Sequence, residues 1–375
     1  MSVGRARRLS DRQRLAWLRL IRTDNVGPAT FRDLINRFGS AEAALEALPE
    51  LAKRGGARKL RIPPEAEVVA EIELAQRLGA SFIAIGEPEY PPLLTGIDHP
   101  PPIIAARGRL ELLREPAFGI VGARNASLAA TKLARRFAAE LGREGLILVS
   151  GLARGIDAAV HQASLATGTI GVLAGGLDKP YPPENDALHA ALCEEGVVLS
   201  EMPFGWSPRS RDFPRRNRIV AGCSYGLLVV EAAIRSGSLI SARLANEMGR
   251  LVFAIPGSPL DPRAAGTNGL IKQGASLVTE TRDIVEALAP LIGKLPPNYQ
   301  GAEEPPDLSS APAPEDDDRM RVVDALTVAP VEVDELIRFT GLMPAQIALI
   351  LLELDLAGRI ERHPGGKVSL LMQGD

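Results

Sequence analysis

The residues best suited to binding chemistry are five arginines within a ten-residue segment that contains a single acid, Asp212. A guanidinium can donate paired hydrogen bonds to a phosphate, and several neighbouring phosphates occur in a nucleic-acid backbone. Phe213 lies among the arginines and could stack on a base or belong to a hydrophobic core. The segment predicts nucleic-acid binding by an arginine cluster made of Arg209, Arg211, Arg215, Arg216 and Arg218.

A second anion-binding feature follows the arginine cluster. The apolar run 226–230 predicts a buried strand, which ends in Glu231. A loop of small residues, Ser236-Gly237-Ser238, then opens a helix. The first N–H groups of a helix have no partner within it, and the helix dipole favours negative charge at that end. We therefore expect this loop to contact a phosphate.

Two more loops repeat this composition after predicted strands. Each combines glycines, where the backbone can approach a ligand, with an arginine that can bind phosphate. They contain Gly122, Arg124 and Ser127 after the strand near 118–121, and Gly151, Arg154 and Gly155 after the strand near 146–149. A further loop of small residues, 174–178, follows the strand near 169–174. Ligands gather at the carboxyl ends of the strands in a doubly wound sheet, so we expect the loops to meet at one edge. The first loop lacks the spacing G-x-G-x-x-G, so no dinucleotide cofactor is expected.

Buried strands alternate with amphipathic helices through the middle of the chain. The strands are continuous apolar runs, which indicates burial on both faces of a sheet. This alternation predicts an α/β fold with a doubly wound, mostly parallel sheet. Strands are expected near 81–85, 103–106, 118–121, 146–149, 169–174, 197–200, 226–231, 251–255 and 276–278, and helices near 127–143, 154–167, 184–194, 214–222, 238–248, 267–273 and 281–292.

Composition shifts divide the chain into four predicted segments. They are a helical domain at 1–75, the α/β domain at 76–293, an acidic, proline-rich linker at 294–318 and a small domain at 319–375. In the first segment, the turn 25–28 between two helices resembles a helix-hairpin-helix unit, whose turn can hold a DNA phosphate. A small helical docking domain explains the same turn equally well.

The last segment combines three helix candidates with a two-stranded hairpin, which is the pattern of a winged helix-turn-helix. Its helix at 344–357 would enter a DNA groove if this domain read DNA. That helix contains no Lys or Arg, however, and it carries Glu353 and Asp355. We therefore favour contact with protein, and we expect the linker to let this domain move independently.

The overall composition limits the possible classes of protein. The net charge of the 375 residues is −3, so nucleic-acid binding must come from a local patch. Cys193 and Cys223 form no C-x-x-C pair, which is typical of a reduced, cytoplasmic protein. The apolar runs are shorter than the roughly 18 residues of a membrane span, and no apolar stretch directly follows the basic N-terminus. We expect a cytoplasmic protein that contacts no membrane.

Asp157 and His161 could supply acid–base chemistry, because a spacing of four residues places both on one helix face. In the structural alternative, Asp157 caps the helix and His161 bonds locally. We favour this alternative because no nucleophile or third polar partner is evident. The sequence also lacks G-x-x-x-x-G-K-[ST] and any metal-binding spacing of Cys or His. No catalytic residue, metal or cofactor is therefore expected.

Several motifs between residues 82 and 290 resemble the bacterial DNA-processing protein A family (DprA/Smf). They include IVGAR, SGLARGIDAAVH, GTIGVLAGGLDKPYPPEN, FPRRNRIVAG and VVEAAIRSGSLISA. The resemblance implies a Rossmann-like fold and a cytosolic, non-enzymatic protein of natural transformation that binds single-stranded DNA. It also implies protection of incoming DNA, loading of the RecA recombinase and a homodimer formed through the Rossmann-like domain. By its motifs the DNA site maps to Arg124, the loop 151–155, Phe213 and the triplet Arg216-Asn217-Arg218.

One position departs from the pattern of this family, and one loop bears on the competing interpretation. Many relatives carry a lysine where this chain has Ser210, between Arg209 and Arg211. The competing interpretation is a nucleotide-binding protein or enzyme of the same superfamily, such as a nucleoside-monophosphate phosphoribohydrolase. Those enzymes carry a P-G-G-x-G-T-x-x-E loop, whereas this chain reads AAIRSGSLISA there, without the glutamate. This difference disfavours the enzyme.

Overall fold

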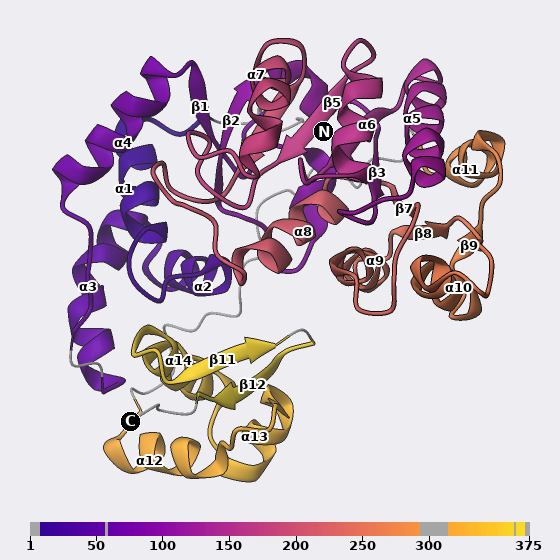
Figure 1. Cartoon of the computed structure of the whole chain (residues 1–375). Helices are drawn as coiled ribbons and strands as arrows, with labels where there is room; N and C mark the ends of the chain where they lie inside the picture. The colour runs from indigo at the N-terminus through magenta and orange to yellow at the C-terminus, as the bar shows by residue number, and fades with distance from the viewer. Residues whose placement is uncertain (1–7, 57–58, 293–313, 364, 372–375) are drawn as a thin grey trace. The chain divides into compact units, whose positions relative to one another are not determined.

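The computed structural model describes residues 8–56, 59–292, 314–363 and 365–371. The chain divides into two compact units (Figure 1). The α/β unit comprises residues 1–8 and 71–300, and the terminal unit comprises residues 9–70 and 301–375. The predicted linker lies outside the described residues as far as position 313.

A nine-stranded sheet forms the α/β unit, in the order β1-β2-β6-β5-β4-β3-β7-β8-β9. All neighbouring pairs from β6 to β9 are parallel, while β2 is antiparallel to both β1 and β6. The predicted doubly wound, mostly parallel sheet is therefore confirmed. The strands are β1 Ala80–Ala84, β2 Ile103–Gly108, β3 Ala117–Val121, β4 Ile147–Ser150, β5 Thr169–Val172, β6 Val197–Ser200, β7 Gly226–Val229, β8 Leu251–Ala254 and β9 Ser276–Leu277.

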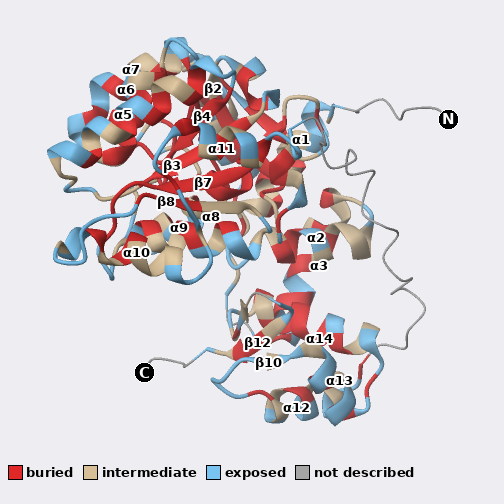
Figure 2. Ribbon diagram, turned by 90° about the vertical axis from the view of Figure 1, so that its right-hand side faces the viewer, coloured by how far each residue is buried: buried red, intermediate tan, exposed pale blue. Residues whose placement is uncertain are grey.

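The central strands are mostly apolar because each face of the sheet borders its own hydrophobic cluster. In β3, Phe118 and Ile120 belong to the cluster shared with α5 and α6, whereas Val121 belongs to the cluster shared with α8 and α9. Figure 2 shows these strands buried, and Figure 1 shows the two helix pairs on opposite sides of them. The helices are α4 Glu65–Arg77, α5 Leu128–Arg143, α6 Ile156–Ser164, α7 Asp186–Glu195, α8 Asp212–Gly222, α9 Gly237–Glu247, α10 Ala265–Lys272 and α11 Thr281–Leu288, with 3-10 helices at Pro92–Gly96, Leu110–Arg114, Pro183–Asn185 and Pro262–Ala264.

Helices from both ends of the sequence build the terminal unit, together with a three-stranded sheet of order β10-β12-β11. Three helices and a β-hairpin in the C-terminal part confirm the predicted winged helix. The elements are α1 Asp11–Ile21, α2 Pro28–Phe38, α3 Ala41–Arg54, α12 Asp316–Ala325, β10 Val331–Glu332, α13 Val333–Thr340, α14 Pro344–Leu356, β11 Ile360–His363 and β12 Lys367–Leu370. Among the described residues no single helix is long and apolar enough to span a membrane, and the bent pair α13–α14 meets that measure by length and composition only.

The winged helix and the N-terminal helices share one hydrophobic cluster. Leu349, Leu352 and Leu356 of α14 belong to the cluster of α1, α2 and α3. This packing differs from the expectation of a winged-helix domain that moves independently. The physical reason is that α14 is apolar on two opposite faces and needs a second partner. The predicted boundaries at 75, 293 and 318 stay a prediction.

Candidate nucleic-acid interface

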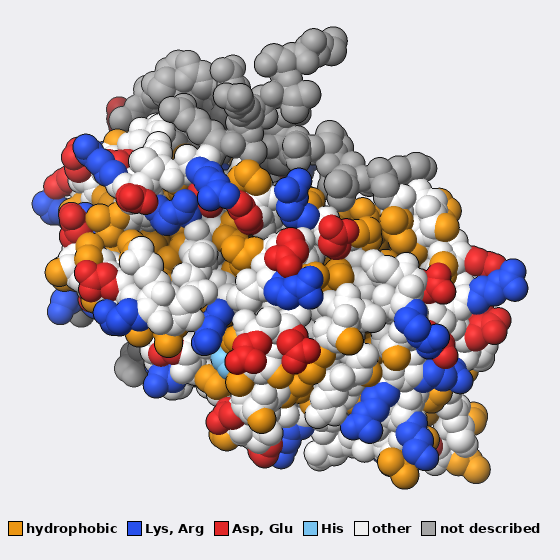
Figure 3. Space-filling view, turned by 90° about the horizontal axis from the view of Figure 1, so that it is seen from above, with side chains coloured by type: hydrophobic (Ala, Val, Ile, Leu, Met, Phe, Trp, Pro, Cys, Tyr) orange, Lys and Arg blue, Asp and Glu red, His pale blue; other side chains and the backbone are white. Residues whose placement is uncertain are grey.

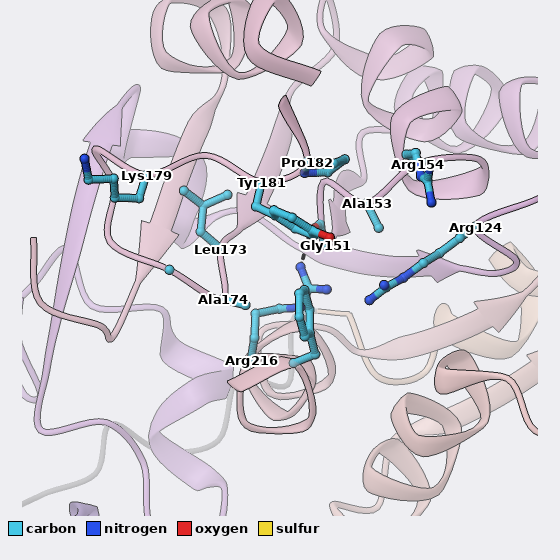
Figure 4. Close-up of a pocket in the computed structure, with 12 residues that line it drawn as sticks. Arg124, Gly151, Ala153, Arg154, Leu173, Ala174, Lys179, Tyr181, Pro182 and Arg216 are labelled. Carbon is cyan, nitrogen blue, oxygen red and sulfur yellow. Dashed lines mark hydrogen bonds between the residues drawn. The ribbon is translucent and has the colours of Figure 1, made fainter. Parts of the chain in front are cut away.

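A pocket opens at the carboxyl ends of β4 and β5, where the predicted loops after β3 and β4 meet (Figure 4). Arg124 comes from the loop after β3, Gly151 and Arg154 from the loop after β4, and Phe213 and Arg216 from α8. In Figure 4 the Arg124 side chain extends toward Arg216. The structure thus brings five predicted residues together. The other lining residues are Ala153, Leu173, Ala174, Gly175, Lys179, Tyr181 and Pro182.

Buried polar side chains hold the loop after β4 in shape. Asp157 accepts hydrogen bonds from the backbone N–H groups of Gly151 and Ala153, at 3.2 and 3.3 Å. Asn185 donates to the Ala153 carbonyl at 3.1 Å. A side chain at Gly155 would place its first atom 2.3 Å from a carbonyl oxygen of the loop after β3, and the φ angle of Gly155 is 76°. Only glycine fits there, so the two loops can touch.

Asp157 and His161 both have structural partners. His161 is fully buried, and its Nδ1 lies 2.7 Å from Thr169 Oγ1. Burial and, secondarily, the charge of Arg216 lower the pKa of His161 to about 3, so the ring is neutral at pH 7. Burial raises the pKa of Asp157, and the Arg216 charge opposes that rise. These contacts favour the structural alternative over an acid–base pair.

Arg216 lies beneath the pocket and is tied to the backbone. Its Nη1 donates to the carbonyl oxygens of Gly151 and Val172, the latter at 2.7 Å, and its Nε donates to Asn217 Oδ1 at 3.0 Å. Burial lowers the pKa of Arg216 to about 10, which leaves it charged at pH 7. A side chain at Gly151 would collide with the guanidinium, and one at Gly122 would collide with an isoleucine of α6. Both glycines therefore serve close packing.

Two other arginines of the cluster are paired with a buried glutamate that local spacing could not reveal. Glu201 follows β6, and its side chain is 5% exposed. It accepts hydrogen bonds from Arg215 Nε at 2.8 Å and from Arg218 Nη2, and Arg218 Nη1 donates to the His99 carbonyl at 2.9 Å. The Arg218 side chain is only 16% exposed, although the arginine cluster was predicted to bind a nucleic-acid backbone. Its carboxylate partner lies on a separate element.

Arg124 and two aromatic rings form the exposed rim of the pocket. The Arg124 guanidinium carbon lies 4.8 Å from the centre of the Phe213 ring. The Tyr181 ring centre is 5.8 Å from that of Phe213, and Tyr181 is 48% exposed. Phe213 is half-buried and lines the pocket, which favours stacking over a core role. Sequence reasoning missed Tyr181 and Lys179, although both lie in the KPYPPEN segment after the β5 loop.

Two predicted loops lie where the strand order reverses, between β3 and β7. The backbone N–H and Oγ of Ser127 donate to the Glu231 carboxylate at 3.0 and 2.6 Å. Ser236 caps α9 and accepts a hydrogen bond from the Ser238 N–H at 3.4 Å, with Gly237 between them. The reversal is the usual ligand crevice of such sheets. These residues are outside the set that lines the pocket, and their contact with DNA stays a prediction.

Arg154 and Arg211 are two further exposed cations among the predicted site residues. Arg154 lies 3.6 Å from Glu184, with both side chains more than half exposed. Such a surface pair is weak, so a phosphate can replace the carboxylate. Arg211 is exposed at the start of α8, beside Arg209, whose guanidinium carbon lies 4.7 Å from the Trp206 ring centre.

Charge is mixed on the face of the molecule that Figure 3 draws. Figure 3 shows one face on which the described Lys and Arg side chains are interspersed with Asp and Glu. Within the described parts of the chain, no group of three or more His, Cys, Asp or Glu is placed to hold a metal ion.

A family model described as DNA recombination-mediator protein A matches residues 81–289, more than half of the chain. The chain belongs to this family. Models of a DprA-like N-terminal HHH domain and a DprA winged helix domain match residues 11–73 and 304–366. The resemblance to the DprA/Smf family is confirmed, and the N-terminal match favours the helix-hairpin-helix interpretation of the turn at 25–28.

Family members of known sequence and structure are similar over much of the chain. Protein Smf of Escherichia coli is 40% identical over 75% of this chain and 75% of its own, and Protein Smf of Synechocystis is 31% identical over 95% and 98%. The structure of DNA processing protein A from Streptococcus pneumoniae has a TM-score of 0.57 and 36% identity, covering 66% of this chain and 82% of its own. That from Helicobacter pylori has a TM-score of 0.53 and 27% identity, covering 57% and 97%.

Proposed function

We propose that this member of the DNA recombination-mediator protein A family binds single-stranded DNA across the rim of the pocket. The observation that carries the proposal is the group of contacting side chains Arg124, Phe213 and Tyr181, with one exposed ring and one exposed guanidinium. Arg154 and Lys179 add positive charge beside this group. Aromatic rings stack on any base and cations follow the backbone, so the binding shows little sequence preference.

The geometry of the rim selects single strands. Base pairs in a duplex stack on one another, so their faces are covered, whereas an unpaired base can lie on an exposed ring. The pocket encloses only about 20 Å³, which is close to the space that one water molecule needs. Bases therefore stack on the rim and do not enter the pocket. The related Helicobacter pylori protein is described as having a single-stranded DNA binding mode, which supports this assignment.

Family membership supports a wider role. The chain acts in DNA processing during natural transformation, where it protects incoming single strands and helps to load the RecA recombinase. It forms a homodimer through the Rossmann-like domain, works in the cytoplasm and carries out no catalysis. These statements follow the family assignment of residues 81–289, which also contain the pocket.

The enzyme alternative is not favoured. A site for a nucleoside monophosphate needs a cleft of about 300 Å³ or more, far above the roughly 20 Å³ enclosed here. Asp157 and His161, the only candidate acid–base pair that we identified, hold the loop after β4 and the β5 strand instead.

Equilibrium binding of a labelled oligo-dT, measured by fluorescence anisotropy at several salt concentrations, tests the proposal. We expect tight binding that weakens as salt is added. The slope of the logarithm of the binding constant against the logarithm of the salt concentration should fall by about 0.7 for each phosphate contact. A blunt duplex of equal length should compete poorly at physiological salt. Equal affinity for the duplex would refute the proposal.

A further inference from the structure

The helix α14 is apolar on two opposite faces, and each face has a different partner. Ile347, Ile350, Leu351 and Leu354 belong to the hydrophobic core of the winged helix. Leu349, Leu352 and Leu356 have the spacing of a second face and lie in the core of the N-terminal helices α1, α2 and α3. Domains whose contacting residues lie 325 and 331 positions apart in the sequence therefore complete one another's cores.

Polar contacts fix this packing at the carboxyl end of α14. Thr30 Oγ1, in the first turn of α2, donates to Asp355 Oδ2 at 2.8 Å. This places a carboxylate at the positive end of the α2 dipole, which is a favourable arrangement. Arg362 bridges Asp355 and Asp33, at 2.9 and 3.0 Å. Asn25, in the hairpin turn, donates to the Leu356 carbonyl at 3.0 Å.

The end of α3 touches the backbone of α14 directly. Gly55 follows α3 with a φ of −69°, a conformation open to any residue. A side chain at this position would nevertheless place its first atom 1.9 Å from the Glu353 carbonyl oxygen. The glycine is therefore required only because α14 lies against it. Glu353 itself is 1% exposed and accepts two hydrogen bonds from Arg319.

We propose that the second face of α14 is a docking surface whose partner is the chain's own N-terminal helical domain. The two domains form one folding module, in which α14 covers the hairpin turn at Asn25 and is itself kept out of any DNA groove. Asp355, an acidic residue of α14 that opposes DNA phosphate, serves this contact, whereas Glu353 pairs with Arg319 of α12 within the winged helix. The inference concerns the terminal unit and does not depend on DNA binding by the α/β unit.

Cleavage of the full-length protein tests the proposal without DNA. A protease recognition sequence is inserted between Gln300 and Gly301, and the protein is cleaved and passed through a size-exclusion column at physiological salt. We expect the 301–375 fragment to elute with the remainder of the protein. If the cleaved protein, without any further substitution, eluted as two separate peaks, the proposal would be overturned.

Larger side chains at Gly55 test this contact separately from any other contact that the 301–375 fragment makes. Gly55→Ala and Gly55→Leu are expected to release the fragment progressively after cleavage and to lower the thermal midpoint of the uncleaved protein. Gly269→Ala in α10 is the matched control, because nothing lies within 4 Å of a side chain there. Helix propensity alone predicts that Gly→Ala at the end of α3 is neutral or stabilising. The proposal would therefore also be overturned if the cleaved Gly55→Leu fragment still co-eluted with the remainder and the thermal midpoint of the uncleaved variant rose.

Discussion

Replacing Arg124 and Arg218 separately by alanine should separate DNA binding from folding. Arg124 is exposed and its recorded contact is with the Phe213 ring, an interaction of about 0.5 kcal/mol at exposed sites. Loss of a charge-assisted bond to phosphate costs about 1.5–3 kcal/mol, or about 10- to 150-fold in affinity. Arg124→Ala should therefore weaken oligo-dT binding by that factor and lower the salt slope by about 0.7. Its thermal midpoint should fall by only about 1–2 °C.

Arg218→Ala should lower thermal stability more than it lowers the affinity for oligo-dT. The substitution removes one arginine partner of the buried Glu201 carboxylate and leaves Arg215, whose side chain is 41% exposed. Breaking a buried pair costs about 3–5 kcal/mol, and the remaining partner reduces this to about 2–3 kcal/mol. The unfolding midpoint of the α/β unit should then fall by about 4–12 °C.

Thermal unfolding and anisotropy titrations on the same preparations provide both measurements. Arg282→Ala is the control, because this side chain is 76% exposed and forms only a surface pair with Glu286. It should change neither quantity. If Arg124→Ala melted several degrees lower while its DNA affinity stayed intact, Arg124 would be a structural residue and the reasoning would be wrong.

Three further changes have defined outcomes. Tyr181→Leu should weaken binding of oligo-dT by about 1–3 kcal/mol whereas Tyr181→Phe keeps it; equal losses in titrations of both would show that the hydroxyl matters and the ring does not. The pKa of His161 is about 3 when folded against about 6.5 when unfolded, so its contribution is present above pH 6.5 and is lost as the pH falls. Between pH 7 and pH 5, urea unfolding should therefore show that the free energy of unfolding falls by about 2 kcal/mol more in the wild type than in His161→Asn. Equal falls in the two proteins would contradict a buried neutral ring. Ending the chain at Gly293 should leave oligo-dT affinity within about threefold while hydrogen exchange in α1–α3 rises; a tenfold loss of affinity would place part of the DNA site on the winged helix.

Local pattern was enough to predict most of the fold. The strand β6 was expected at 197–200 and lies at Val197–Ser200, and the helix expected at 344–357 is α14, Pro344–Leu356. Buried strands and amphipathic helices are visible in sequence because their apolar residues follow a short period. The loops after β3 and β4 were also predictable, since parallel strands bring their carboxyl ends to one edge.

The roles of individual arginines could not be predicted in this way. Five similar side chains within ten residues have different environments: Arg216 is buried on backbone carbonyls, and Arg218 is tied to Glu201. These partners come from other strands, so no spacing within the cluster reveals them. The second face of α14 was present in the sequence, because Leu349, Leu352 and Leu356 recur at helical spacing. Its partner lies at the other end of the chain, and only the structure identifies it.

Photo-cross-linking of a single strand that contains 5-iodo-deoxyuridine tests most directly where the DNA lies. The halogenated base couples to aromatic side chains that it stacks upon, and mass spectrometry of the digested complex identifies the peptide. The account predicts cross-links in the peptides that contain Tyr181 and Phe213, and a loss of the first in Tyr181→Leu. Cross-links confined to residues 11–54 or 316–370, with none at Tyr181 or Phe213, would contradict the assignment of DNA binding to the rim of the α/β pocket.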